Sequence, residues 1–343
     1  DAQGTLFFAI KGERNDGHAY VHTLYALGVR QFVVERPIVD LRLLGGSNII
    51  AVDSSVDALQ KLAAFRRQYF SLPVVGITGS NGKTIIKEWL FQLLNPDFRI
   101  AKNPGSYNSQ IGVPLSVWQL QPYHQLGIFE AGISQPGEMV KLEKIIRPTI
   151  GIFTNLGTAH DEGFDSAQEK AWEKLHLFAR AGTLIYCSDN STVDQEIERQ
   201  KIPAISWGFE QKADYRVQQE KNKITLTGKE GVLQFDLPFS DRASVENILH
   251  CIVLMLKLNY TPTVIQERVL HVQPVAMRLE LKQGINNCQI IDDSYNNDLG
   301  GLQISLDFLA GLQKKKKTLI LSDILQTGLE EKELTMRIRE RIL

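Results

Sequence analysis

The stretch 73–84, Pro-Val-Val-Gly-Ile-Thr-Gly-Ser-Asn-Gly-Lys-Thr, constrains the fold of this chain more than any other. It begins as an apolar, β-branched run, which predicts a buried strand. A loop of glycine, serine and asparagine follows, and Lys83 and Thr84 open the apolar, helix-compatible run 85–94. Such a strand, glycine loop and helix N-terminus form a phosphate cradle, because backbone N–H groups and the helix dipole attract anionic oxygens.

This loop departs from the general phosphate-loop pattern G-x-x-x-x-G-K-[ST], whose first glycine would fall on Ile77. Where the general pattern is met, the lysine reaches the terminal phosphates and the hydroxyl that follows it ligates Mg²⁺. Lys83 and Thr84 therefore indicate a nucleotide site. A strand, turn and helix without a ligand is the alternative for this stretch taken alone.

The composition is that of an ordinary globular protein of two or three domains, with 343 residues, 43% hydrophobic and 22% charged. A net charge of -1 gives no sign of a nucleic-acid or membrane partner. No apolar run is long enough to span a membrane. The three cysteines lie far apart and predict reduced thiols in a cytoplasmic protein. Because the chain starts at Asp1 and stops inside a charged helical pattern, we expect a fragment of a longer protein.

Predicted strands and helices alternate through the first two thirds of the chain. The strands are 5–10, 31–35, 49–53, 73–78, 100–102, 127–130, 149–154, 183–187 and 204–207, and the helices are 20–27, 56–69, 85–94 and 169–181. This order predicts an α/β fold with a doubly wound parallel sheet. Ligands of such sheets bind beyond the carboxyl ends of the strands, so the loop, Glu130, Asn155 and His160 are expected to converge.

The last third of the chain changes character. Alternating runs at 215–219, 223–227 and 232–237 predict a small antiparallel meander, and 244–258 predicts an apolar helix. A third region opens at Pro274, with predicted strands 279–281, 289–291 and 318–321 and a helix at 302–312. The amphipathic helix 56–69 is interpreted as a linker between domains.

Several stretches, in order along nearly the whole chain, resemble the Mur ligases. The loop 78–84 is similar to that family's T-G-x-N-G-K-T, which explains the missing glycine. The other matching stretches are the UDP-binding segment 7–18, the substrate loop 103–114, the metal-binding strand 129–132, the metal-histidine segment 154–164 and the third-domain signature 292–296. The resemblance implies three domains: an N-terminal α/β UDP-binding domain (1–71), a central ATP-binding domain with a P-loop-type parallel sheet (72–272) and a truncated Rossmann-like C-terminal domain (273–343).

The resemblance implies an ATP-dependent amide ligase of peptidoglycan synthesis. It is strongest to those Mur ligases that add D-Ala-D-Ala to UDP-N-acetylmuramoyl-tripeptide through an acyl phosphate. ATP and two Mg²⁺ ions are the implied cofactors. Lys83 would clamp the terminal phosphates, and Thr84, Glu130 and His160 would ligate the metals.

Further binding residues are carried over from the matching motifs. The phosphate loop would contribute Gly79, Asn81 and Gly82; the adenine and nucleotide contacts would be Asn247, Arg278 and Asp293; the UDP end would be held by Lys11, Asp16 and His18; and the peptide and dipeptide would lie near Asn108, Ser109, Tyr295 and Asn296. A structural turn is the alternative for Asn108 and Ser109, and an ordinary polar helix position is the alternative for Asn247.

Many Mur ligases carry a carbamylated lysine, in which CO₂ turns the amine into a carboxylate-like metal ligand. The family spacing K-x-x-x-F, counted back from Phe178, places this lysine at Lys174. Lys170 is the competing candidate, and a solvated helix lysine is the alternative for either.

Three departures from the family pattern qualify the resemblance. The family's adenine segment H-N-x-x-N corresponds to Ala-Ser-Val-Glu-Asn at 243–247, which retains only Asn247. The D-S-Y-N motif is followed by Asn297 and Asp298, where the family usually has Ala-Asn. Residues 322–325 are Ser-Asp-Ile-Leu, where the family usually has G-D-M-x-E-L. The last variant and the segment 241–251 resemble the ligase half of a fusion with an alanine racemase. Other functions compatible with the loop are a sister Mur ligase, a folylpolyglutamate-type ligase, a P-loop kinase or NTPase, or a non-catalytic module attached to a racemase.

Overall fold

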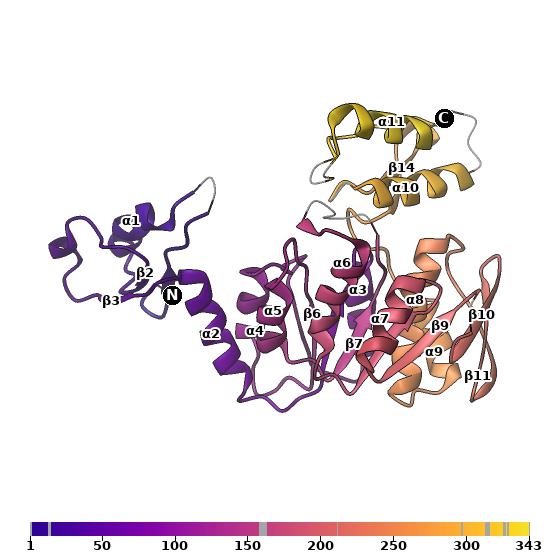
Figure 1. The fold of residues 1–343 in the computed structure, drawn as a ribbon, viewed down its shortest axis with the longest axis horizontal. Coiled ribbons are helices and arrows are strands. Elements are labelled where there is room, and N and C mark those ends of the chain that lie inside the picture. The colour runs from indigo at the N-terminus through magenta and orange to yellow at the C-terminus, as the bar shows by residue number, and fades with distance from the viewer. Residues whose placement is uncertain are drawn as a thin grey trace.

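A computed structural model describes residues 2–12, 15–157, 163–210, 212–295, 298–312, 316–324, 327 and 329–342. These residues form an α/β structure with three separate sheets (Figure 1). Within these ranges no helix is both long and apolar enough to cross a membrane.

The N-terminal region is a small parallel sheet of β1 (Leu6–Phe8), β2 (Gln31–Val34) and β3 (Asn48–Ala51), in that order. Its helical segments are η1 (Gly17–Tyr20), α1 (Val21–Ala26) and η2 (Leu41–Leu44). Phe32 and Val21 lie at the centre of its own hydrophobic core. The predicted strands 5–10 and 31–35 and the predicted helix 20–27 are confirmed, each with shorter bounds than expected.

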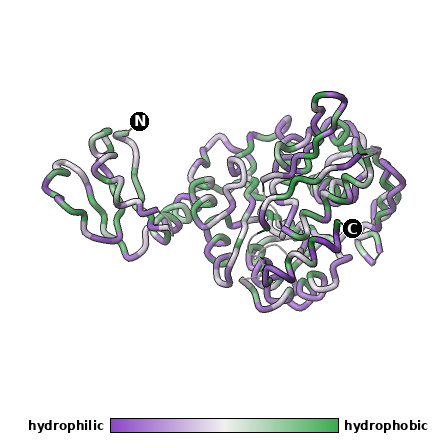
Figure 2. The backbone as a smooth tube through the Cα atoms, turned by 90° about the horizontal axis from the view of Figure 1, so that it is seen from above, coloured by the Kyte–Doolittle hydropathy of each residue, from purple (hydrophilic) through white to green (hydrophobic). Residues whose placement is uncertain are grey.

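Helix α2 (Ser55–Arg67) joins this region to the rest, as the linker prediction required (Figure 1). It starts at Ser54, whose side chain accepts a hydrogen bond from the Asp57 backbone N–H at 3.1 Å, and it packs on α4 (Gly112–Trp118) and α5 (Glu138–Ile146). Arg67 is only 5% exposed and donates to the backbone carbonyls of residues 70, 146 and 147. Seen from above, the N-terminal region projects from one end of the molecule (Figure 2).

The central sheet has nine strands in the order β12-β11-β10-β9-β8-β7-β4-β6-β5. Their bounds are β4 (Val74–Thr78), β5 (Ile100–Lys102), β6 (Leu126–Glu130), β7 (Ile150–Phe153), β8 (Thr183–Cys187), β9 (Ala204–Gly208), β10 (Tyr215–Glu220), β11 (Lys223–Gly228) and β12 (Gly231–Asp236). The strands from β5 to β10 pair in parallel, whereas β10, β11 and β12 pair antiparallel. The predicted meander is therefore an extension of the same sheet.

Helices cover both faces of this sheet, as a doubly wound fold requires. One core packs α3 (Lys83–Leu94), α8 (Arg242–Lys257) and α9 (Pro262–Val269) against it, and the other packs α4, α5 and α7 (Ser191–Gln200). Four of these helices, α4, α5, α7 and α9, were not predicted from the sequence. The predicted helix 169–181 is α6 (Ala167–Leu175), continued by the 3-10 turn η4 (His176–Phe178).

The third region holds an antiparallel hairpin of β13 (Glu280–Gln283) and β14 (Gln289–Asp292), with the 3-10 turn η5 (Ile285–Asn287) and the exposed Cys288 between them. Helices α10 (Leu299–Gly311) and α11 (Glu331–Ile342) follow. The predicted strand 318–321 is wrong: its residues pair with no strand of the described chain, and Ile320 is 94% exposed. The strands described between 273 and 343 thus pair only antiparallel, unlike those of a Rossmann-like sheet.

Candidate active site

The phosphate loop follows β4, in the middle of the parallel strands. Gly79 has a φ of 144° and Gly82 a φ of 80°, both in the region that favours glycine. A Cβ on Gly79 would lie 2.0 Å from Thr154 Oγ1, and one on Gly82 would lie 2.2 Å from Asn247 Oδ1. The loop therefore depends on glycine at both positions, both for its backbone and for the close approach of its neighbours.

The end of β7 holds this loop in place. The Ser80 N–H donates to the Asn155 backbone oxygen, and the Asn81 N–H donates to Asn155 Oδ1, each at 2.9 Å. The Thr154 hydroxyl donates to the Asn81 carbonyl. The predicted convergence of strand ends is thus found for Asn155, which fixes the loop backbone.

Lys83, the first residue of α3, curls back over the loop. Its Nζ donates to the carbonyls of Gly79 at 2.9 Å and Ser80 at 2.8 Å. Burial of the ammonium lowers the pKa of Lys83 to about 8, and the Glu130 carboxylate partly opposes that shift. A cation thus lies within the cradle at neutral pH.

Glu130 ends β6 and is fully buried. Its Oε1 accepts hydrogen bonds from Thr84 Oγ1 and Asn108 Nδ2, each at 3.2 Å, and its backbone N–H donates to Asn103 Oδ1 at 2.7 Å. Glu130 Oε2 is buried and has no hydrogen-bond partner among the described residues. An unsatisfied buried carboxylate oxygen is costly, so this atom fits a cation ligand.

The donor set suits Mg²⁺ rather than a metal held entirely by the protein. Within the described ranges, no three His, Cys, Asp or Glu side chains gather as a metal cage. Mg²⁺ commonly takes only one or two protein carboxylates, together with waters and substrate phosphates. Glu130 and the Thr84 hydroxyl beside the phosphate loop fit that pattern, whereas the predicted ligand His160 lies outside the described residues.

Lys174 lies under the phosphate loop. It is 2% exposed, and its Nζ donates to the Gly79 carbonyl at 3.2 Å. Burial, with Lys83 and Lys170 nearby, holds the pKa of Lys174 well below its ordinary range. The competing candidate Lys170, also buried and one turn earlier on α6, donates to the Gly157 carbonyl at 2.6 Å. Both lysines face the loop region, and the solvated alternative fails for both.

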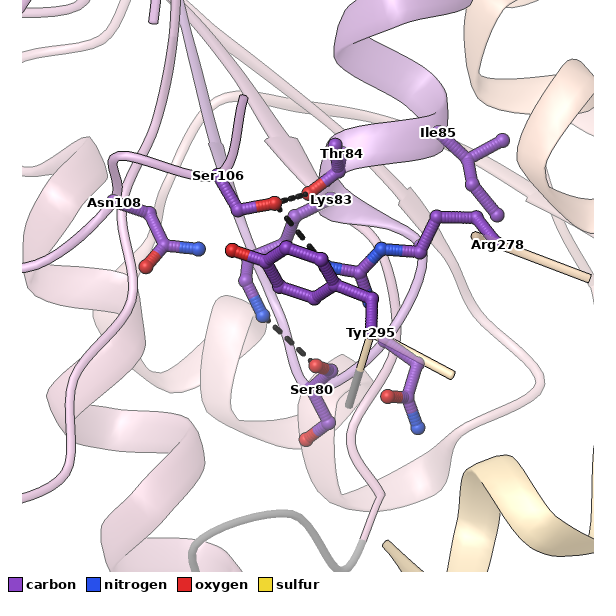
Figure 3. A pocket seen from close by; sticks show the side chains of 10 residues that line it. Ser80, Lys83, Thr84, Ile85, Ser106, Asn108, Arg278 and Tyr295 are labelled. Atoms are coloured by element: carbon purple, nitrogen blue, oxygen red, sulfur yellow. Dashed lines mark hydrogen bonds between the residues drawn. The ribbon is translucent and has the colours of Figure 1, made fainter. Parts of the chain in front are cut away.

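The third region contributes two residues to the rim of the phosphate loop. Arg278 stacks over the Tyr295 ring at 4.0 Å and donates from Nη2 to Ser106 Oγ at 3.1 Å. Figure 3 shows both side chains beside Lys83 and Thr84, around a cavity of about 190 Å³. Asp293 accepts from the Leu279 N–H at 3.1 Å and from Ser305 at 2.6 Å. Asn296 lies outside the described residues.

A second cavity of about 330 Å³ adjoins the same loop. Its polar lining includes Asn247, next to Gly82, and Asp293. Its apolar wall includes Trp89 and Phe239, whose rings stack with centroids 5.1 Å apart. A flat apolar wall with a few polar groups beside a phosphate cradle is the form expected of a nucleobase pocket.

A third cavity of about 340 Å³ is lined by Lys83 and Lys174 together with Asn108 and Ser109. Ser109 Oγ also accepts from the Gly112 N–H at 3.1 Å, at the start of α4. Ser109 therefore both stabilises the turn before α4 and lines the cavity.

Lys11, Asp16 and His18 lie in the N-terminal region, beyond α2 from the phosphate loop (Figure 1). Asp16 Oδ1 accepts from His18 Nδ1 at 2.6 Å, and His18 Nε2 accepts from the Glu35 N–H at 3.0 Å. Hydrogen bonds from His18 lower the pKa of Asp16. Both ring nitrogens of His18 are thus used within the protein, while Lys11 is exposed.

Three residues that shape the site had no signal of their own in the sequence. Asn103 holds the Glu130 backbone, the buried Lys87 donates to the carbonyls of Asn103 and Gly105, and Ser106 contacts both Thr84 and Arg278. All three act on or within a loop of turn-forming residues, where residue type alone does not separate structural from functional positions.

Comparisons with known proteins agree with this geometry. The family model of the Mur ligase middle domain matches residues 77–255. The UDP-N-acetylmuramoyl-tripeptide–D-alanyl-D-alanine ligase of Bacillus subtilis is 29% identical over 339 residues, covering 96% of this chain and 73% of its own length. The Escherichia coli enzyme of that name is 28% identical over 351 residues, covering 98% and 75%.

Solved structures give the same result. The MurF ligase of Thermotoga maritima in complex with ADP superposes with a TM-score of 0.85 at 26% identity, covering 99% of this chain and 79% of that one. MurF from Acinetobacter baumannii gives 0.84 at 27% identity, covering 95% and 72%. The phosphate loop after β4, the buried glutamate that ends β6 and the two buried lysines of α6 agree with these matches. The chain belongs to the Mur ligase family.

Proposed function

We propose that this chain is an ATP-dependent amide ligase that adds D-Ala-D-Ala to UDP-N-acetylmuramoyl-tripeptide in peptidoglycan synthesis. The observation that carries the proposal is the convergence of Lys83, Thr84, Glu130 and Lys174 on one phosphate loop. The names of the relatives supply the substrates, and the ADP complex of the Thermotoga maritima enzyme supports nucleotide binding at this fold.

The chemistry that such a site must perform is dominated by charge. A carboxylate is a poor electrophile, so ATP first converts it to an acyl phosphate, which the amine of the dipeptide attacks as phosphate leaves. Phosphoryl transfer between anions needs positioning and neutralisation of charge more than an acid–base pair. Lys83 would hold the terminal phosphates, and the loop N–H groups would orient them.

Mg²⁺ is the metal that the donor set fits. Thr84 and Glu130 would hold an ion beside the phosphate loop, and His160 would bind a second Mg²⁺. When bound, the ions would neutralise charge on the phosphates. Buried Glu130 Oε2 supports this assignment. Asn247, Arg278 and Asp293 would contact the nucleotide, because all three line the apolar-walled cavity beside the loop.

Carbamylation of Lys174 belongs to the same proposal. Burial lowers the pKa of this amine and so favours its neutral form, and a neutral amine nitrogen can add to the carbon of CO₂ and release one proton to give a carbamate anion. The anion would supply a carboxylate-like metal ligand where an ammonium could not. We expect Lys174→Ala to lose activity by about 10²-fold or more and to be partly rescued by short carboxylates.

Lys170→Ala is the matched test of the carbamate. A ¹³C carbamate resonance from labelled bicarbonate should persist in Lys170→Ala and vanish in Lys174→Ala. The reverse pattern would move the modification to Lys170, and full activity of Lys174→Ala would reject it.

The remaining substrate positions complete the proposal. Lys11, Asp16 and His18 would bind or shape the UDP end, Asn108 and Ser109 the peptide, and Tyr295 and Asn296 the dipeptide. The division into domains at 1–71, 72–272 and 273–343 and the fusion to a racemase stay predictions.

Phosphate release is the direct test of the function. It should require ATP, UDP-N-acetylmuramoyl-tripeptide and D-Ala-D-Ala together, and a product carrying the dipeptide should form in equal amount. Equal ATP turnover without the dipeptide would favour a P-loop NTPase, and turnover with a folate and glutamate would favour a folylpolyglutamate-type ligase.

A further inference from the structure

A chain of hydrogen bonds links the third region to the buried glutamate of the central sheet. Arg278 Nη2 lies 3.1 Å from Ser106 Oγ, Ser106 Oγ lies 2.9 Å from Thr84 Oγ1, and Thr84 Oγ1 lies 3.2 Å from Glu130 Oε1. Figure 3 shows the first two contacts, with Ser106 between Arg278 and Thr84. Within the stretch 103–114, the sequence did not distinguish Ser106 from the other polar residues.

Elementary donor and acceptor rules set the direction of this chain. A guanidinium has no acceptor, so Arg278 donates to Ser106; an ionised carboxylate has no donor, so Glu130 accepts from Thr84. Each hydroxyl carries one proton, so Ser106 donates its own proton to Thr84. A cation at one end and an anion at the other polarise the bonds in the same sense.

These hydrogen bonds connect the central region with the third region. Thr84 is the second residue of α3 and Glu130 is the last residue of β6, whereas Arg278 precedes β13 in the third region. The Tyr295 ring lies over the Arg278 guanidinium, and Asp293 fixes the backbone one residue further at Leu279. Ser106 is therefore placed where the third region meets the phosphate loop.

We propose that Ser106 is a positioning residue that couples docking of the third region to the orientation of Thr84 and Glu130. When Arg278 lies against the loop, the proton of Ser106 is directed to Thr84, and the proton of Thr84 is directed to Glu130. A second lone pair of Thr84 Oγ1 then stays available to a cation. The consequence for ATP use rests on the proposed function, whereas the docking itself does not.

Hydrogen–deuterium exchange of the unliganded protein tests the docking without any reaction. Ser106→Ala should speed exchange of the β13 and β14 amides by about ten-fold, the effect of one hydrogen bond to a charged group. Ser106→Thr keeps the hydroxyl and should restore slow exchange. Unchanged exchange in Ser106→Ala would overturn the proposal.

Ser206→Ala is the matched control, because it also removes a serine hydroxyl that makes two hydrogen bonds. Ser206 Oγ donates to Asp214 Oδ2 at 3.1 Å and accepts from the Asp214 N–H at 3.0 Å, on β9 away from the three cavities. Faster β13–β14 exchange in this control would mean general loosening and would count against Ser106.

A double-mutant cycle with Arg278→Ala separates coupling from a local structural role. Calorimetry of ADP binding with Mg²⁺ should show about ten-fold weaker binding for Ser106→Ala in the wild-type background, but less than about two-fold in the Arg278→Ala background. Equal factors in both backgrounds would overturn the coupling. If the wild-type protein bound no ADP at all, the proposed function would fail, while the exchange result would still decide the docking.

Discussion

Two lysines share the carbonyl oxygen of Gly79. Lys83 Nζ lies 2.9 Å from it and Lys174 Nζ lies 3.2 Å from it. Desolvation by burial, together with the charges of Lys83 and Lys170, lowers the pKa of Lys174. One backbone oxygen thus contacts two buried amines, and burial lowers the pKa of both.

Lys83→Met tests the phosphate role at the residue scale. We expect ADP formation to fall about 10²–10³-fold, because a preorganised positive charge is lost from the reacting phosphates. The free energy of unfolding should stay equal or rise, since a desolvated ammonium is removed. Lys61→Met on the exposed face of α2 is the control and should keep full turnover. Turnover within three-fold of wild type in Lys83→Met would contradict the role.

His250 makes stability depend on pH. It is fully enclosed between Trp207 Nε1, which donates to its Nδ1 at 3.2 Å, and the Thr154 carbonyl, 3.1 Å from its Nε2. Burial lowers the pKa of His250 from 6.5 to about 4. The unfolded chain therefore binds one more proton between these values, and stability falls as the pH falls through that window.

The expected loss from His250 approaches about 3 kcal/mol at pH 4, since each pKa unit corresponds to about 1.4 kcal/mol. Urea unfolding at pH 7 and pH 4 should show this loss in the wild type and a smaller one in His250→Gln. The exposed His271→Gln should keep the wild-type pH dependence. An equal loss in the free energy of unfolding between pH 7 and pH 4 in wild type and His250→Gln would show that His250 does not cause the pH dependence.

At this scale the loop motif and the strand ends predicted Lys83, Thr84 and Glu130 in one site, and the resemblance to the Mur ligases implied Lys174 there. The sequence did not predict Ser106, whose role depends on a contact with Arg278 across 172 positions. It also did not show that His18 uses both ring nitrogens internally, since pairing partners depend on tertiary structure.

At the scale of elements, two glycines offer a matched pair. Gly82 and Gly137 both precede a helix, with φ of 80° and 81°. A Cβ at Gly137 would meet nothing within 4 Å, whereas one at Gly82 would meet Asn247. Alanine at either position would therefore have the same unfavourable backbone conformation, but only alanine at Gly82 would also clash with a neighbouring side chain.

Gly137→Ala should lower the free energy of unfolding by about 1–2 kcal/mol and leave ADP affinity unchanged. Gly82→Ala should lower the free energy of unfolding further than Gly137→Ala does. It should also weaken ADP binding about ten-fold or more, because either the loop or Asn247 must move. Thermal unfolding and calorimetry give both quantities. Equal effects of the two substitutions would show that only the backbone conformation matters.

Strands of the central sheet were predicted well, because buried parallel strands are continuous apolar runs. The strand at 318–321 failed for the same reason: its apolar sequence favours a strand, but strand formation also needs a neighbouring strand. Helix α9, which follows the last strand of the sheet, was missed. Helices α4, α5 and α7 were missed as well, although parallel strands require such crossovers. Topology, rather than local pattern, demands them.

At the scale of the whole molecule, Arg67 fixes α2 to the central region. Arg67→Met would leave the carbonyls of residues 70, 146 and 147 without this donor, so we expect a loss of at least about 2 kcal/mol in urea unfolding. Small-angle scattering should show a wider range of positions for the N-terminal region. Lys61→Met on the same helix should change neither quantity, and a rigid, fully stable Arg67→Met would contradict the anchor.

The β13–β14 hairpin of the third region contains a cysteine that a dye can label. Cys288 is exposed at its end, whereas Cys251 is buried and burial raises the pKa of Cys187 to about 12. All three cysteines are described, so a maleimide dye should react at one position without any engineering. The native protein thus offers a single fluorescent reporter on the hairpin that follows Arg278 in the chain, and its energy transfer from the tryptophans can follow docking of the third region in real time.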